Sequence, residues 1–188
     1  MPNARSLKFG FYMHAKRLLN AASGHLAPLI KFAVDTGGRL SELLHLDWCH
    51  VEMNQMRICF IDTKNGEDRT IKLCDTAIAT LNALGPKEKG RVFTYNGKPI
   101  GSVKTAFNTA RNNAGLNDVR FHDLRHTFAS RLVQAGIPLY DVMHLTGHKS
   151  LEMVQRYSHL APDYADRAIQ ALNAIGHNLG TVERQDAA

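Results

Sequence analysis

The change of hydrophobic period along the chain limits the fold more than any other feature of the sequence. In residues 26–34 and in most of the chain after residue 75, apolar residues recur at helical spacing. Three short β-prone runs, rich in Val, Ile and Phe, lie between these regions, at Trp48–Met53, Met56–Ile61 and Arg69–Leu73. The pattern predicts an α+β fold that is mostly α-helical, with a small antiparallel three-stranded sheet.

Turn residues mark the expected boundaries of these elements. An Asn65-Gly66 turn is expected to join the second and third strands. Thr36-Gly37-Gly38 is typical of a helix stop, because glycine tolerates the left-handed backbone found there. Arg39 follows directly, so it is expected at a tight turn before a helix for which Ser41 is the predicted N-cap. The segment 91–100 is expected to be a loop.

Composition and charge limit the kinds of partner and the cellular compartment that are expected for the protein. The net charge of +6 and the pI near 9.4 are compatible with a polyanionic partner but do not specify one. No apolar run is long enough to cross a membrane, and the first ten residues lack the apolar core of a signal peptide. The three cysteines, Cys49, Cys59 and Cys74, lack the spacing of a metal site and are interpreted as reduced thiols. Reduced thiols favour a cytoplasmic location.

The stretch from Phe121 to Leu160 carries residue types suited to chemistry on a phosphate. His122 and Arg125 are three residues apart and therefore share one face of a helix. His148 follows a predicted helix stop, and Tyr157 lies in a segment whose expected N-cap is Ser150. Arginine binds phosphate oxygens with a planar fork, histidine moves protons near neutral pH, and tyrosine can act as a nucleophile.

Two residues from earlier in the chain complete this set. Arg39 lies in the glycine turn, where Glu42 is one helical turn away and could orient it, and Lys64 lies in the predicted hairpin. Each residue taken alone has an ordinary structural interpretation. Tyr157 could be a packing residue, His148 could interact with a helix dipole, and Lys64 could be a solvated turn residue. The joint pattern favours function.

In this order and setting, four segments resemble the tyrosine recombinases, the phage integrase family. They are TGGRLSEL, TKNG, FHDLRHTFASRL and TGHKSLEMVQRYSHL. The resemblance extends over roughly residues 26–163. It implies the catalytic-domain fold of that family and site-specific recombination or integration of DNA, as in mobile elements. Gly38 and Thr146 depart from it, since a bulkier residue and a leucine are common at those positions, but neither replaces a reacting group.

The resemblance also implies which bonds form and break in the reaction and which residues transfer protons. Tyr157 would attack the DNA phosphate, leaving a 3′-phosphotyrosyl link and a free 5′-hydroxyl. His122 would act as the general base for Tyr157, and Lys64 would protonate the leaving 5′-oxygen. The covalent link stores the energy of the phosphodiester, so no ATP or other cofactor is expected.

The remaining residues of the implied site bind the phosphate. Arg39 and Arg125 would contact its nonbridging oxygens, and His148 would donate a hydrogen bond to it. Glu42 and Asp123 would support these residues without touching the phosphate. The two arginines supply the positive charge that Mg²⁺ supplies in many phosphoryl transfers, so no metal is expected.

Domain organisation and partners follow from the same resemblance. Residues 1–24 are expected to form a linker or short helix, residues 25–176 the catalytic domain, and residues 177–188 a polar tail. The N-terminal core-binding domain usual in the family is expected to be absent. Expected partners are double-stranded DNA, three further copies in a homotetramer on DNA with exchange of C-terminal segments, and accessory DNA-bending proteins, at the nucleoid.

Three alternatives remain open from the sequence. His122 and His126 are four residues apart, as in HExxH zinc hydrolases, but Asp123 stands where the glutamate would be. The chain could also be a non-catalytic DNA-binding or regulatory remnant of an integrase. The third alternative is nicking and closing of the type IB topoisomerase kind, which uses the same residues. His126 lies beside the recombinase pattern and is interpreted as structural.

Overall fold

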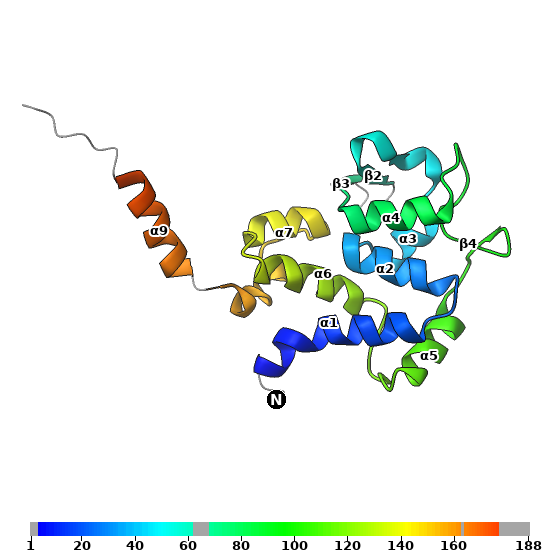
Figure 1. The fold of residues 1–188 in the computed structure, drawn as a ribbon, viewed down its shortest axis with the longest axis horizontal. Helices are drawn as coiled ribbons and strands as arrows, with labels where there is room; N and C mark the ends of the chain where they lie inside the picture. The colour runs from blue at the N-terminus through cyan, green and yellow to red at the C-terminus, as the bar shows by residue number, and fades with distance from the viewer. Residues whose placement is uncertain (1–3, 62–67, 163, 177–188) are drawn as a thin grey trace, which may run out of the picture.

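The computed structural model describes residues 4–61, 68–162 and 164–176, and it is mostly helical (Figure 1). The α-helices are α1 (Ala4–Ala21), α2 (Leu26–Thr36), α3 (Leu40–His45), α4 (Asp75–Leu84), α5 (Lys104–Asn113), α6 (Asp123–Gln134), α7 (Leu139–Thr146), α8 (Glu152–Gln155) and α9 (Tyr164–Gly176). The strands are β1 (Val51–Glu52), β2 (Arg57–Phe60), β3 (Arg69–Lys72), β4 (Thr94–Tyr95) and β5 (Lys98–Pro99). Short 3-10 turns are η1 (Trp48–His50), η2 (Met53–Gln55) and η3 (Ser158–Leu160).

The three-stranded sheet confirms the predicted fold class. Its strands run in the order β1-β2-β3, and both pairs are antiparallel. Ile58, Phe60 and Ile71 alternate with more exposed neighbours and are at most 4% exposed, so one face of the sheet belongs to the core. The register pairs Phe60 with Arg69, which fixes the position of Arg69 at the start of β3.

Two local predictions were wrong. The run that begins at Trp48 is not extended throughout: it starts with η1, because the Asp47 carboxylate accepts the backbone N–H of Cys49. The segment 91–100 is not only a loop, since it contains the β4–β5 hairpin. Asn96 and Gly97 have φ angles of 51° and 76°, the left-handed conformation that a two-residue hairpin turn requires.

Helix α2 lies at the centre of the helical body, against α1, α4 and α6 (Figure 1). Its stop at Gly37 is confirmed, with φ 64° and a backbone N–H that donates to Ala33 O. A Cβ atom at Gly37 would lie 2.4 Å from Cδ1 of Phe128, on α6. Glycine at this position therefore allows both the left-handed turn and the close approach of α2 to α6. Four residues of the predicted apolar face of α2 are at most 1% exposed: Leu26, Leu29, Ile30 and Ala33.

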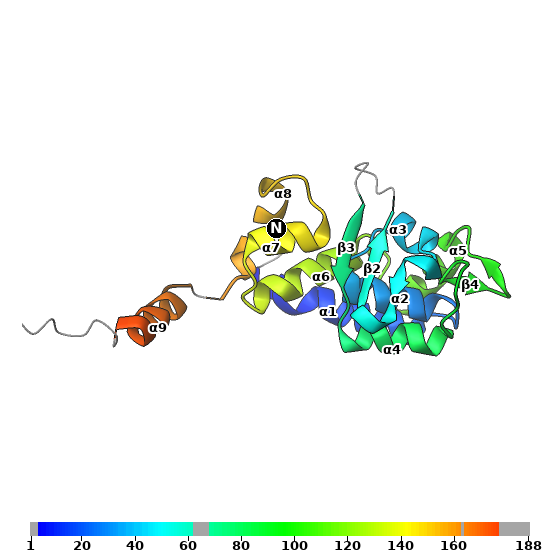
Figure 2. The ribbon, with the colours of Figure 1, turned by 90° about the horizontal axis from the view of Figure 1, so that it is seen from above.

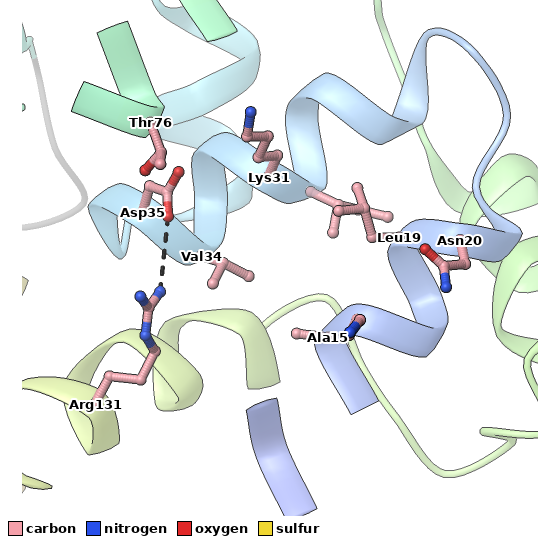
Figure 3. Close-up of a pocket in the computed structure, with 10 residues that line it drawn as sticks. Ala15, Leu19, Asn20, Lys31, Val34, Asp35, Thr76 and Arg131 are labelled. Atoms are coloured by element: carbon pink, nitrogen blue, oxygen red, sulfur yellow. Dashed lines mark ion pairs between the residues drawn. The ribbon is translucent and has the colours of Figure 1, made fainter. Parts of the chain in front are cut away.

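Helix α1 is longer than the short helix expected at the N-terminus, with 18 residues. It packs against α2, α5 and α6, and its Leu18 is fully buried in the main core. A cavity of about 350 Å³ lies where α1 meets α2, beside the ion pair of Asp35 with Arg131 of α6, 3.7 Å apart (Figure 3). Of the predicted catalytic residues that the structure describes, none lines this cavity.

A second, smaller apolar cluster lies apart from the main core. Its buried residues come from α6, α7, α8 and the turn that follows α8: Ala129, Val133, Val142, Val154, Tyr157 and Leu160. Beyond it, α9 extends away from the body in both views (Figures 1 and 2). The apolar side chains Ile169, Leu172 and Ile175 of α9 are 57%, 61% and 68% exposed. No helix in the described part of the chain is long and apolar enough to span a membrane.

Candidate active site

Arg39 is the N-cap residue of α3, directly after the glycine turn. Its backbone N–H donates to Glu42 Oε2 at 2.8 Å, and its Nη1 donates to Glu42 Oε1 at 2.5 Å. The predicted cap, Ser41, is instead inside the helix, because the Glu42 carboxylate reaches back to the free N–H at the helix start. Arg39 Nη2 donates to Gly147 O at 2.9 Å, so the turn is joined to the end of α7.

Arg125 lies in the first turn of α6 and is 2% exposed. Its Nη1 donates to Gly37 O at 2.8 Å, and its Nη2 donates to Thr146 O. Both arginines of the sequence pattern therefore join the glycine turn after α2 to the end of α7.

A third arginine, which the sequence reading did not select, completes the cluster. Arg69 Nη1 donates to Leu145 O at 2.7 Å, and Nη2 donates to Glu42 Oε2 at 2.7 Å. Its guanidinium lies over the Phe60 ring, 5.1 Å from the ring centroid, and its side chain is 10% exposed. Arg69 is thus a buried cation that links the sheet to Glu42 and α7.

The three guanidinium groups bind three consecutive carbonyls at the C-terminal end of α7. Leu145 O accepts from Arg69, Thr146 O accepts from Arg125, and Gly147 O accepts from Arg39. Carbonyls at a helix C-terminus lack partners within the helix and carry the negative end of its dipole, so cations are favoured there. We call Arg39, Arg69 and Arg125 the arginine cluster.

Charge within the arginine cluster is unbalanced. Glu42 is the carboxylate that pairs with it in the described part of the chain, through Arg39 and Arg69. Burial alone raises the pKa of Glu42, but Arg69 and the hydrogen bonds from Arg39 outweigh it and hold that pKa below its usual value. Burial, reinforced by Arg39 and Arg69, lowers the pKa of Arg125 to about 9, so its guanidinium is still charged at neutral pH. Three cations and one carboxylate leave an excess of positive charge, which favours the binding of an anion.

His148 lies beside the arginine cluster, directly after Gly147. Its Nδ1 is 2.5 Å from Oγ1 of Thr146, which is fully buried and also lies 2.6 Å from Val142 O. Burial, followed by the charges of Arg125 and Arg39, lowers the pKa of His148 to about 4. His148 is therefore neutral at pH 7, with its ring held by the Thr146 hydroxyl.

Tyr157 lies in the turn between α8 and η3 rather than within a helix. Helix α8 has four residues and ends at Gln155, and its N-cap residue is Leu151 rather than the predicted Ser150. The Tyr157 side chain packs in the second apolar cluster, and the residue is 5% exposed. Burial raises the pKa of Tyr157, although the charges of Arg156 and Arg125 act in the opposite direction.

The Tyr157 hydroxyl makes a hydrogen bond with Nδ1 of His126. His122, predicted to act on Tyr157, instead contacts His126 edge-to-face, with ring centroids 4.9 Å apart. The sequence reading gave His126 a structural role and missed this contact. The i,i+4 spacing of His122 and His126 was the available signal, because it places both rings on one face of α6.

Two predicted residues remain, Asp123 and Lys64. Asp123 is the first residue of α6, where its Oδ2 accepts the backbone N–H of Arg120 at 2.8 Å. Lys64 falls in the connection between β2 and β3 and lies outside the described residues. Across residues 4–61, 68–162 and 164–176, no three His, Cys, Asp or Glu side chains group in positions that could hold a metal ion.

The structure therefore brings Arg39, Arg125 and His148 together around the end of α7. It places Tyr157, His126 and His122 in a second group. The charge of Arg125 acts on the pKa of Tyr157, so the two groups are close enough to interact electrostatically. Such an arrangement can bind a phosphate diester and present a hydroxyl to it.

Comparison with known proteins finds similar sequences and folds. The integrase of Salmonella phage P22 is 35% identical over 178 residues, which cover 86% of this chain and 46% of that integrase. The catalytic domain of bacteriophage HP1 integrase superposes with a TM-score of 0.69 and 28% identity, covering 84% of this chain and 90% of that domain. XerH recombinase, crystallised bound to palindromic difH substrate, shares the fold with a TM-score of 0.62 and 22% identity, covering 86% of this chain and 52% of its own.

The chain spans about half the length of such full-length relatives, 46% in the case of the P22 protein. The family model described as the phage integrase family matches residues 12–163, a segment that contains the arginine cluster, both histidines of α6, His148 and Tyr157. By sequence and by fold, the chain belongs to the phage integrase family of tyrosine recombinases.

Proposed function

We propose that the chain catalyses site-specific recombination of double-stranded DNA, by cleaving and rejoining strands through a 3′-phosphotyrosyl intermediate. The observation that carries the proposal is the arginine cluster, in which three guanidinium groups lie with one carboxylate and the charge of Arg125 acts on Tyr157. A phosphodiester carries one negative charge and gains a second as its phosphorus becomes pentavalent. The excess positive charge of the cluster suits that transition state better than the ground state.

Each residue then has a role in the reaction. Tyr157 is the nucleophile, and Arg39 and Arg125 bind the nonbridging oxygens with the donor atoms that do not face α7. Neutral His148 donates to the phosphate from Nε2 when the Thr146 hydroxyl gives its proton to Nδ1 rather than to Val142 O.

Proton transfer is assigned to two further residues. His122 provides the base for the Tyr157 proton, and Lys64 protonates the leaving 5′-oxygen. Glu42 orients Arg39, and Asp123 fixes the start of α6. No metal or other cofactor enters this scheme, because the arginine cluster supplies the positive charge.

A covalent trapping experiment tests the proposal. The protein is incubated with a library of nicked duplexes that carry a randomised region, and SDS-stable protein–DNA adducts are isolated and sequenced. The wild type should form adducts, and Tyr157→Phe should form none while retaining DNA binding in a gel-shift assay. Arg125→Ala, which removes one guanidinium of the cluster, should slow adduct formation by about 100- to 1000-fold.

The same experiment separates the alternatives. Binding of the library without any wild-type adduct would mean a non-catalytic DNA-binding protein. Relaxation of supercoiled plasmid by the wild type, without joining of one duplex to another, would mean topoisomerase-like nicking and closing. Cleavage of DNA that leaves no adduct and is abolished by EDTA would point to the zinc hydrolase alternative.

Assembly is part of the proposal. The exposed apolar side chains of α9 lie three residues apart, so they form one face of the helix: Ile169, Leu172 and Ile175. We propose that this face docks on a neighbouring copy, in a homotetramer formed on DNA, with accessory DNA-bending proteins at the nucleoid.

A further inference from the structure

The contact between His126 and Tyr157 is not explained by the roles given so far. His126 lies on α6, and Tyr157 lies 31 residues later in the turn after α8. Nδ1 of His126 bonds the Tyr157 hydroxyl, and the two ring centroids are 5.9 Å apart. The hydroxyl that would attack the phosphate therefore already has a nitrogen base in direct contact.

Burial makes this contact specific. Tyr157 is 5% exposed, and in the described part of the chain the partner of its hydroxyl is His126. A buried hydroxyl that donates to no acceptor loses free energy, so Tyr157 is expected to donate its proton to Nδ1. His126 must then be the neutral tautomer with its proton on Nε2.

The surroundings keep His126 neutral in the free protein. Burial is the largest effect and lowers its pKa to about 4. Most of the charged and titratable groups that face it from α6, the end of α7 and the turn after α8 act in the same direction. These groups are His122, Asp123, Arg125, His148, Arg156 and Tyr157. Of the charged groups, only Asp123 favours the imidazolium. A bound phosphodiester would add a second negative charge and so favour transfer of a proton to His126.

We propose that His126 is a catalytic residue that takes the Tyr157 proton directly, and that His122 acts on the nucleophile only through His126. This inference rests on the proposed function and changes the path of the proton within it. The bond from Tyr157 Oη to phosphorus forms as the bond from phosphorus to the 5′-oxygen breaks. The hydroxyl proton moves to Nδ1 of His126, and the electron pair of the broken bond goes to the 5′-oxygen, which Lys64 protonates.

Geometry supports this order of contacts. His122 is an exposed residue at the N-terminus of α6, and its ring meets the His126 ring edge-to-face. In this position the His122 ring orients the His126 ring and can share the positive charge that His126 gains. The His126 imidazole separates His122 from Tyr157. During rejoining, the same proton returns from Nδ1 of His126 to the tyrosine oxygen.

The decisive variant is His126→Asn, because the asparagine amide can accept a hydrogen bond near the Nδ1 position but cannot hold the proton. The rate of adduct formation is measured under single-turnover conditions, from pH 5 to 9, on a nicked duplex selected from the randomised library. We expect His126→Asn to be about 100-fold slower at pH 7. Its rate should then rise continuously with pH, as ionisation of Tyr157 replaces the missing base.

His144→Asn is the matched control, since the ring of His144 meets Tyr140 of α7 edge-to-face, with ring centroids 4.5 Å apart, rather than a side chain of the site. It should react at the wild-type rate. A His126→Asn protein within threefold of the wild type, with the same pH profile, would overturn the inference while leaving the proposed function intact. If the wild type forms no adduct, the proposed function fails instead.

A measurement on the free protein tests the contact without DNA. Nitrogen-15 NMR of the histidine rings should show His126 with an unprotonated Nδ1 at pH 7. The Nδ1 shift should move in Tyr157→Phe, which removes the hydroxyl and little else. A protonated Nδ1, or a shift unchanged in Tyr157→Phe, would rule out the proposed transfer whatever the DNA experiments show.

Discussion

Arg69 illustrates how a single side chain can hold several elements of the site together. It binds Leu145 O at the end of α7, the carboxylate of Glu42 and the face of Phe60. The planar fork of arginine can make all three contacts at once, whereas a lysine ammonium cannot. The position of Glu42, and through it of Arg39, therefore depends on Arg69.

Arg69→Lys should lower the free energy of unfolding by about 2 kcal/mol, because hydrogen bonds to charged partners are lost from a buried site. Urea unfolding at pH 7 measures the change. Arg57→Lys is the matched control in the neighbouring strand, where Arg57 pairs with Glu52 and both side chains are more than one third exposed, at 37% and 44%. Because water and salt screen an exposed ion pair, Arg57→Lys should change the stability much less than Arg69→Lys. Equal losses in the two variants would contradict the role given to Arg69.

Thr146 is the second residue whose loss has a defined consequence. Thr146→Val keeps the shape of the side chain but removes the hydroxyl that holds Nδ1 of His148, so adduct formation should slow by about 10-fold. Thr80→Val is the control, since Thr80 on α4 is also buried and bonds a carbonyl one turn earlier, Thr76 O, but contacts no histidine. Both variants should lose about 1 kcal/mol of stability. An unchanged rate in Thr146→Val would show that His148 needs no such support.

At the scale of elements, the junction of α2 with α6 decides where Arg39 lies. Gly37→Ala should destabilise the protein by about 3 kcal/mol, since it combines a left-handed backbone with a Cβ atom against Phe128. Gly85→Ala separates the two effects, because Gly85 has φ 76° but no atom within 4 Å of the added Cβ. It should cost about 1 kcal/mol. Similar unfolding midpoints for the two variants would mean that Phe128 moves aside without cost.

Elements with a local signal could be predicted from the sequence. The helical stripe of α2, the stop at Gly37 and the sheet strands all follow from spacing and turn residues within a few positions. The Asn96-Gly97 turn had the same kind of signal and was overlooked. The 3-10 turn at Trp48 could not be read from hydrophobic period, because the Asp47 side chain outweighs the β propensity of the residues that follow.

Only part of the candidate site could be predicted from the sequence, because some of its contacts depend on strand register and helix length. The resemblance supplied Arg39, Arg125, His148 and Tyr157. The structure brings the first three together at the end of α7 and places Tyr157 in a second group, against His126. Arg69 was missed because only the β2–β3 register aims it at Glu42, 27 positions away in the chain. The contact of Tyr157 with His126 depends on how short α8 is, which no local pattern specifies.

For the whole molecule, buried neutral histidines make stability depend on pH. The pKa values of His126 and His148 are about 4, compared with 6.5 for an exposed histidine. Between those values the unfolded chain binds more protons than the folded chain, so stability is greatest above pH 6.5 and falls as the pH falls towards 4.

The free energy of unfolding should therefore fall by about 1 to 2 kcal/mol between pH 7 and pH 5.5. Urea titrations at the two pH values measure it, and His126→Asn should reduce the difference by roughly half. A stability that is constant or increases over this range would contradict the burial of these two rings.

Assembly provides the other prediction at this scale. Leu172→Glu places a charge in the middle of the apolar face of α9 and should prevent the tetramer on DNA, measured by analytical ultracentrifugation with the selected duplex. Gln170→Glu is the control, because it adds the same charge to α9 outside the row formed by Ile169, Leu172 and Ile175. A tetramer that persists in Leu172→Glu would remove α9 from the interface.

The separate apolar cluster around Tyr157 has a consequence for local unfolding. Six buried residues hold this segment, whereas the main core holds α2 and the sheet. A small cluster opens at a lower free energy than the core, so hydrogen exchange of the α8 amides should proceed by a sub-global opening while the α2 amides exchange only on global unfolding. Tyr157 thus belongs to a cooperative unit of its own, and it can move relative to the arginine cluster at a free-energy cost well below that of unfolding the protein.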